Sequence, residues 1–105
     1  MSQRKHKRSG ELLEKKKLKV KRPPRYQVIF HNDDYTTQDF VVEMLKTYFH
    51  KKHSEAVHLM LTIHKTGSGV AGVYPRDIAE TKRAQVEQRA TSRSLPLRLS
   101  LKEDE

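Results

Sequence analysis

Residues 30–40 read Phe-His-Asn-Asp-Asp-Tyr-Thr-Thr-Gln-Asp-Phe, and two apolar patterns of different period meet in this stretch. Before it, every second residue of Tyr26–Phe30 is large and apolar, which is typical of a strand with one buried face. After it, Thr36 and Asp39 have the spacing of a capping box ahead of an apolar helix. The stretch therefore predicts the end of a strand, a turn and the start of a helix.

The turn contains three small polar residues, Asn32, Asp33 and Asp34. Such side chains tolerate the backbone angles of a tight turn and bond to their own backbone, so one interpretation is turn chemistry alone. Two carboxylates and an amide at a strand end also form a cluster of hydrogen-bond acceptors, which suits an ammonium group. Which interpretation holds depends on what else reaches the turn.

The net charge of +9 over 105 residues is distributed unevenly along the chain. Residues 1–22 contain ten basic and two acidic side chains, so nearly all of the positive charge lies there. This lysine-rich segment has too few large apolar residues to fold alone, and we expect a disordered basic extension at 1–22 followed by one domain at 23–105. Because the domain is then almost neutral, a nucleic-acid-binding domain is disfavoured.

The remaining composition narrows the class of protein further. Cysteine is absent, which excludes disulfides, a thiolate nucleophile and cysteine metal sites, and a reducing cytoplasm is allowed. No apolar run approaches the roughly 20 residues of a membrane span, and the N-terminus lacks the apolar segment of a secretory signal. We expect a soluble, cytoplasmic protein that does not bind a membrane.

The periodicity downstream of the turn indicates five further elements. Phe40–Phe49 has the wide apolar face of a core helix, and Ser54 is a suitable N-cap for a second helix that ends at His64 to Lys65, before Gly67. Val70–Tyr74 predicts a short strand, Pro75 opens a mostly polar third helix, and Leu97–Leu101 alternates as a strand with one buried face. The expected fold is α+β, a two-layer domain with a three-stranded, mostly antiparallel sheet packed on three helices in the order βααβαβ.

Outside the turn, His64 is the residue best suited to a chemical role. It lies eight residues after Ala56 on the second helix, so we expect it to point inward or into a cleft. It is either a structural histidine or a partner of Asn32 and Asp33 that accepts a hydrogen bond from an ammonium group. No histidine pair has the spacing of a zinc site, and no nucleophile motif is present, so we expect no metal, no cofactor and no catalytic residue.

Seven short motifs in register give the chain a specific resemblance to a known family. They are Pro-Pro-x-Tyr-x-Val-Ile at 23–29, Asn-Asp-Asp-Tyr-Thr at 32–36, Asp-Phe-Val-Val at 39–42, Met-Leu-x-x-His at 60–64, Gly-Val-Tyr at 72–74, Ile-Ala-Glu-Thr-Lys at 78–82 and Pro-Leu at 96–97. With them, residues 23–102 closely resemble ClpS, the adaptor that brings substrates with destabilising N-terminal residues to the ClpA unfoldase and the ClpP protease.

The resemblance implies a role for particular residues. The α-amino group of the substrate would be held by Asn32, Asp33 and His64. Its first side chain would enter a pocket lined by Thr36, Gln38, Val41, Met60, Ile63 and Leu97. Asp77 and Lys82 on the third helix would dock on the N-terminal domain of the unfoldase, and the basic extension would assist delivery. Thr37 and Gln38 depart from the family pattern, which usually has Pro-Met at these two positions.

Three hypotheses of function follow. The leading one is a non-enzymatic adaptor for proteins with N-terminal Leu, Phe, Tyr or Trp, with a ClpA-type AAA+ unfoldase as partner and no specific nucleic acid. The second is a small basic RNA-binding protein, although a near-neutral domain does not supply a clear basic stripe. The third, and least supported, is a metal-dependent hydrolase.

Overall fold

The computed structural model describes residues 22–105, and these residues form the expected α+β domain. The expected extension at 1–22 lies outside the described residues except for Arg22. The elements follow one another in the predicted βααβαβ order. They are β1 (Arg25–His31), α2 (Gln38–Phe49), α3 (His53–Thr66), β2 (Ser68–Pro75), α4 (Arg76–Ser92) and β3 (Arg98–Asp104).

The sheet has the order β2-β1-β3, and both strand pairs are antiparallel. Val28 in the central strand lies opposite Gly72 on one side and Leu101 on the other. The register with β2 shifts after Val28, because Ile29 pairs with Val70 and leaves one β2 residue without an opposite partner. The prediction of a mostly antiparallel three-stranded sheet is confirmed.

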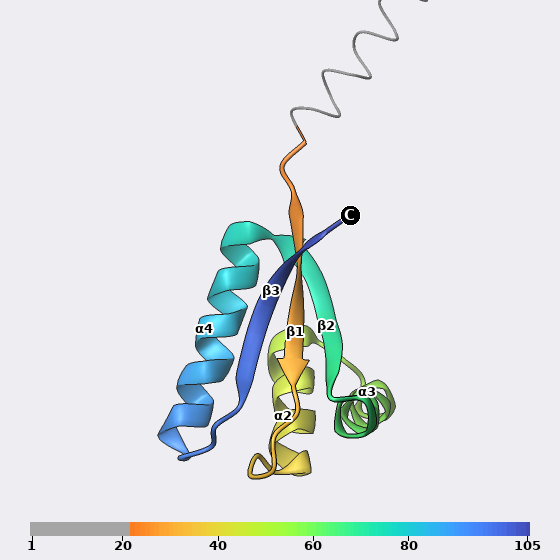
Figure 1. Cartoon of the computed structure of the whole chain (residues 1–105), viewed down its shortest axis with the longest axis vertical. Helices are drawn as coiled ribbons and strands as arrows, with labels where there is room; N and C mark the ends of the chain where they lie inside the picture. The colour runs from red at the N-terminus through yellow and green to blue at the C-terminus, as the bar shows by residue number, and fades with distance from the viewer. Residues whose placement is uncertain (1–21) are drawn as a thin grey trace, which may run out of the picture.

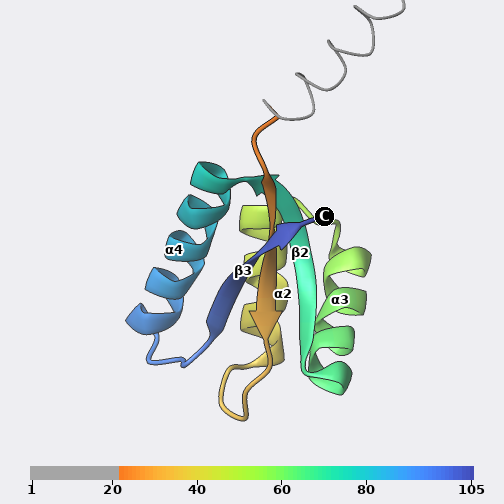
Figure 2. The ribbon, with the colours of Figure 1, turned by 45° about the horizontal axis from the view of Figure 1, so that its top comes forward.

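The helices form a layer that lies behind and beside the sheet, as Figures 1 and 2 show. Helix α2 lies behind β1, α4 runs beside β3, and α3 lies beside β2. The core forms where alternate β1 residues meet α2: Phe30 is fully buried, and its ring makes an edge-on contact with Phe49 at 5.5 Å between centroids. Helix α2 has six buried residues and is the main core helix, as predicted. Burying one large apolar side chain stabilises the folded state by about 1.5–3 kcal/mol.

The first two helices after the turn, α2 and α3, each begin at a different residue from the one that the sequence indicated. Helix α2 is capped by Thr37, whose Oγ1 accepts a hydrogen bond of 3.1 Å from the Phe40 amide, so the predicted capping box of Thr36 and Asp39 is wrong. The Thr36 hydroxyl is instead bonded to a residue of the turn. The cap lies one residue later because the Thr36 hydroxyl donates to Asp33, whereas the Thr37 hydroxyl accepts from the helix.

Helix α3 begins at His53, not after Ser54, and its cap position is Lys52. The Glu55 carboxylate accepts a hydrogen bond from the Lys52 amide at 3.4 Å, so an acid in the first turn replaces a polar cap residue. The helix continues to Thr66, slightly beyond the expected end, and stops at Gly67. Gly67 has a φ of 98°, a conformation that ends helices and that glycine adopts without strain.

Candidate functional site

The turn after β1 is organised by the Asp33 carboxylate. One of its oxygens accepts hydrogen bonds from the amides of Tyr35 (2.8 Å) and Thr36 (2.6 Å), and the other accepts one from the Thr36 hydroxyl (2.6 Å). Partial burial alone would raise the pKa of Asp33, but the hydrogen bonds from Thr36 and Tyr35 outweigh it and lower the pKa below 3.8. Asp33 is therefore ionised at neutral pH and fixed in one orientation.

A backbone hydrogen bond joins this turn to the end of α3. The Asn32 amide donates to the Gly67 carbonyl at 2.9 Å, and the Gly67 amide in turn donates to the Ile63 carbonyl at 2.9 Å. The last turn of α3, which carries His64, is thereby held beside the start of the turn. This hydrogen bond thus brings together the two segments that contain Asn32, Asp33 and His64.

His64 itself is exposed, so it does not point into the core, and the alternative that it points into a cleft stays a prediction. The reason is helical geometry: eight residues exceed two full turns by about 80°, so His64 has rotated away from the face on which Ala56 is buried. Its neighbour Ile63 is only 3% exposed and takes the inward position. Asn32 is also exposed, whereas Asp33 is half-buried.

The apolar residues that were predicted to line a pocket share one environment. They are Val41 from α2, Met60 and Ile63 from α3, and Leu97 before β3, each between 3% and 8% exposed, and all belong to one apolar cluster. Thr36 is half-buried at the edge of the turn, and Gln38 is exposed at the first position of α2. The four apolar residues are therefore part of the core of the domain, while Thr36 and Gln38 lie nearer to the surface.

The two residues predicted to dock a partner differ in their surroundings. Asp77 is exposed in the first turn of α4. Lys82 is half-buried: its Nζ donates a hydrogen bond of 2.6 Å to the Tyr48 carbonyl, and it lies 5.1 Å from the centre of the Tyr74 ring. Lys82 thus stabilises the C-terminal end of α2, a role that its position in the sequence, 34 residues away from Tyr48, could not indicate.

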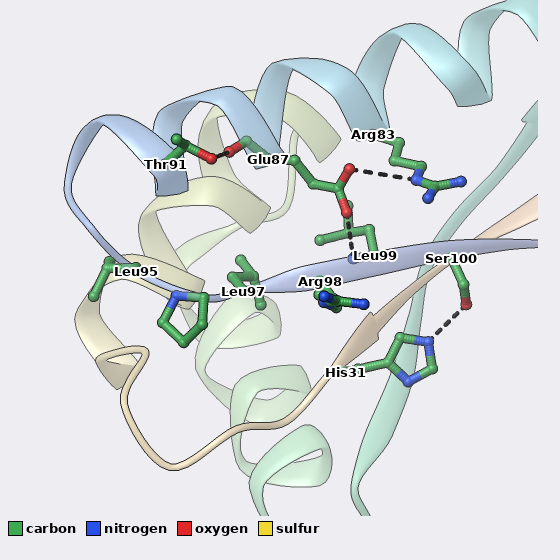
Figure 3. Close-up of a pocket in the computed structure, with 10 residues that line it drawn as sticks. His31, Arg83, Glu87, Thr91, Leu95, Leu97, Arg98, Leu99 and Ser100 are labelled. Atoms are coloured by element: carbon green, nitrogen blue, oxygen red, sulfur yellow. Dashed lines mark hydrogen bonds and ion pairs between the residues drawn. The ribbon is translucent and has the colours of Figure 1, made fainter.

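A hollow with a volume of about 730 Å³ lies between α4 and β3, and sequence reasoning did not find it. Figure 3 shows three charged side chains of the hollow, Arg83 and Glu87 from α4 and Arg98 from β3, together with His31 from the end of β1. His31 and Arg98 lie opposite each other in the sheet. Only the strand register brings them together, so no pattern in the sequence could have grouped them.

Within residues 22–105, no group of three or more histidine, aspartate or glutamate residues is arranged to hold a metal ion. No described helix is both long and apolar enough to cross a membrane.

Comparison with known proteins places this geometry in a family. The family model described as ATP-dependent Clp protease adaptor protein ClpS matches residues 21–100. The ATP-dependent Clp protease adapter protein ClpS of Myxococcus xanthus is 53% identical over 89 residues, which are 85% of this chain and 83% of the relative. The ClpS of Syntrophus aciditrophicus is 53% identical over 85 residues, 81% of this chain and 79% of the relative.

A solved structure agrees with the sequence relatives. The structure of Agrobacterium tumefaciens ClpS2 bound to L-phenylalaninamide superposes with a TM-score of 0.77 at 36% identity, covering 79% of this chain and all of the other. The chain therefore belongs to the ClpS family of ATP-dependent Clp protease adaptors.

Proposed function

We propose that this chain binds the free N-terminal amine and the bulky first side chain of substrate proteins, and delivers them to a ClpA-type unfoldase for degradation by ClpP. In this proposal residues 23–105 are the adaptor domain, which acts in the cytoplasm without catalysing a reaction and without a cofactor. Substrates begin with Leu, Phe, Tyr or Trp.

The observation that carries the proposal is the backbone link between the turn and the end of α3. The bond from the Asn32 amide to the Gly67 carbonyl keeps an ionised carboxylate, an amide and an imidazole within two adjoining segments. All three groups accept hydrogen bonds, and an ammonium group offers three donors and a positive charge. A free N-terminus is the form of a polypeptide that supplies such a group.

Four apolar residues of the expected pocket support the second half of the proposal. Val41, Met60, Ile63 and Leu97 come from three separate parts of the chain and belong to the same apolar core. An apolar side chain entering there gains about 25 cal/mol for each Å² removed from water. L-Phenylalaninamide, the ligand in the related structure, combines a free amine with an aromatic side chain, which is the chemistry that this site would accept.

Delivery requires a second surface, which we assign to α4. Asp77 is exposed on it, and Lys82 has two ammonium hydrogens besides the one given to Tyr48. The basic segment at 1–22 would assist the handover of substrate.

The test of recognition is a fluorescence anisotropy titration with labelled peptides that have a free or an acetylated N-terminal Leu. Acetylation removes the charge and donors of the amine, and hydrogen bonds to charged groups are worth about 1.5–3 kcal/mol each, so losing two weakens binding at least about 100-fold. Equal binding of the two peptides would contradict the proposal.

Variants then assign the effect to residues. Asn32→Ala and His64→Ala should weaken the free peptide strongly and the acetylated one little. His58→Ala is the matched control, because His58 is an exposed histidine on the same helix and lies outside the proposed site. If His58→Ala weakened the free peptide as much as His64→Ala, the assignment of His64 would be wrong.

A further inference from the structure

The hollow between α4 and β3 carries more basic than acidic side chains. Arg83, Arg98 and His31 line it together with a single carboxylate, Glu87. Its other lining groups are hydroxyl-bearing or apolar, and they include Leu97 of the proposed side-chain pocket. A hollow of about 730 Å³ has room for several atoms of an extended peptide.

The one carboxylate of the hollow is occupied by bonds within the protein. One oxygen of Glu87 accepts a hydrogen bond of 3.0 Å from the Leu99 amide, and the other lies 3.5 Å from Nε of Arg83 (Figure 3). Arg98, in contrast, forms no ion pair with any residue of the described part of the chain, 22–105. The Arg98 guanidinium is therefore the uncompensated charge of the hollow, and all five of its N–H groups are donors.

The hollow adjoins the proposed substrate site, at its amine end and at its side-chain pocket, through two pairs of chain neighbours. His31 directly precedes Asn32, and Arg98 directly follows Leu97. His31 and Arg98 are also opposite one another at the ends of β1 and β3, where the turn begins. The His31 ring is fixed there by a contact of 2.6 Å between its Nε2 and Oγ of Ser100 (Figure 3).

We propose that this hollow receives the residues that follow the N-terminal residue of a substrate, and that Arg98, with Arg83 and His31, selects acidic side chains at those positions. The inference rests on the proposed function, because it needs the first residue to be held beside Asn32 and Leu97. A chain leaving that site passes the His31–Arg98 pair, where a carboxylate gains an attractive charge and a lysine meets a repulsive one.

The test uses three labelled peptides with a free N-terminal Leu whose second to fourth residues are Glu, Ser or Lys. Exposed ion pairs contribute about 0.2–1 kcal/mol each, so at low ionic strength the Glu peptide should bind about fivefold more tightly than the Lys peptide. The difference should disappear in about 1 M salt, where the screening length falls to about 3 Å.

Two variants locate the preference. Arg98→Gln should bring the ratio of the Glu and Lys affinities close to one. Arg89→Gln removes the same charge from an exposed position of α4 that does not line the hollow, and it should keep the wild-type ratio. Circular dichroism and a denaturation midpoint confirm that both variants are folded.

The outcomes separate this inference from the function on which it rests. A preference for Glu that Arg98→Gln abolishes and Arg89→Gln retains supports it. Equal affinities, a preference for Lys, or a ratio that Arg98→Gln leaves unchanged overturns it while the Ser peptide still binds. If the Ser peptide fails to bind, the proposed function is wrong and this inference falls with it.

Discussion

Replacing Asp33 with asparagine tests the turn on which the site is built. The change keeps the shape of the side chain, removes its charge, and exchanges an accepting oxygen for an NH₂ group. In the wild type, the carboxylate accepts three hydrogen bonds, two of them from Thr36. The new side chain would keep one acceptor oxygen for the two amides, but the Thr36 hydroxyl would have to turn round to accept from the introduced NH₂ group.

The size of the effect follows from these three bonds. A hydrogen bond to a charged group is worth about 1.5–3 kcal/mol and a neutral one about 0.5–1.5, so each bond weakens by about 1 kcal/mol. Tyr35 is exposed and its amide can bond to water, so only the two bonds from half-buried Thr36 count fully. We expect Asp33→Asn to lower the free energy of unfolding by about 2 kcal/mol at neutral pH.

The pH dependence of this loss has a definite sign. Because the pKa of Asp33 is lower in the folded protein than its ordinary 3.8, the carboxylate stabilises the fold at pH values above 3.8. That stabilisation is lost as the pH falls through the folded-state pKa. The difference in stability between wild type and Asp33→Asn should therefore be full at neutral pH and shrink in acid.

Urea denaturation followed by circular dichroism measures both quantities. Asp34→Asn is the matched control, because Asp34 is the adjacent, exposed acid and the change should cost less than about 0.5 kcal/mol. Equal stability of the two variants at neutral pH would refute the role given to the Asp33 hydrogen bonds. Asp33→Asn should also weaken binding of a peptide with a free N-terminal amine more than Asp34→Asn does.

Three further results are expected. Lys82→Met keeps the length of the side chain but removes the hydrogen bond to the Tyr48 carbonyl, so it should destabilise the fold by about 1–3 kcal/mol in urea denaturation; an unchanged midpoint would contradict its structural role. Gln38, whose amide favours water, should leave a looser pocket rim than the usual Met, so Gln38→Met should widen the affinity gap between N-terminal Leu and Ile peptides. No change in that gap would exclude Gln38 as a selectivity residue. Removing residues 1–21 should preserve peptide affinity and impair substrate degradation; full degradation would place the role of the extension elsewhere.

Local periodicity was sufficient to predict the framework of the domain. The alternation in Tyr26–Phe30 and the apolar face of Phe40–Phe49 are set by burial, which repeats at the period of each element, and both were confirmed. The turn itself was recognisable from Asn32, Asp33 and Asp34, because small polar side chains bond to their own backbone, as Asp33 does to Tyr35 and Thr36. Its link to α3 was only an expectation until the Asn32–Gly67 bond was seen.

Contacts between distant segments could not be predicted from the chain alone. The rotation of about 80° from Ala56 to His64 follows from their spacing, but the exposure of His64 also depends on which elements cover that side of α3. The bond from Lys82 to the Tyr48 carbonyl and the facing pair of His31 and Arg98 depend on helix packing and strand register. Neither contact produces a periodic pattern in the sequence, because each involves a polar side chain and a partner far away along the chain.

The most direct test of the adaptor's function is degradation of a fluorescent reporter by a ClpA-type unfoldase with ClpP, in the presence and absence of this chain. Two reporters are compared that are identical except for an N-terminal Leu whose amine is either free or acetylated. We expect the chain to accelerate loss of fluorescence for the free-amine reporter and not for the acetylated one. Acceleration of both reporters, or of neither, would contradict it.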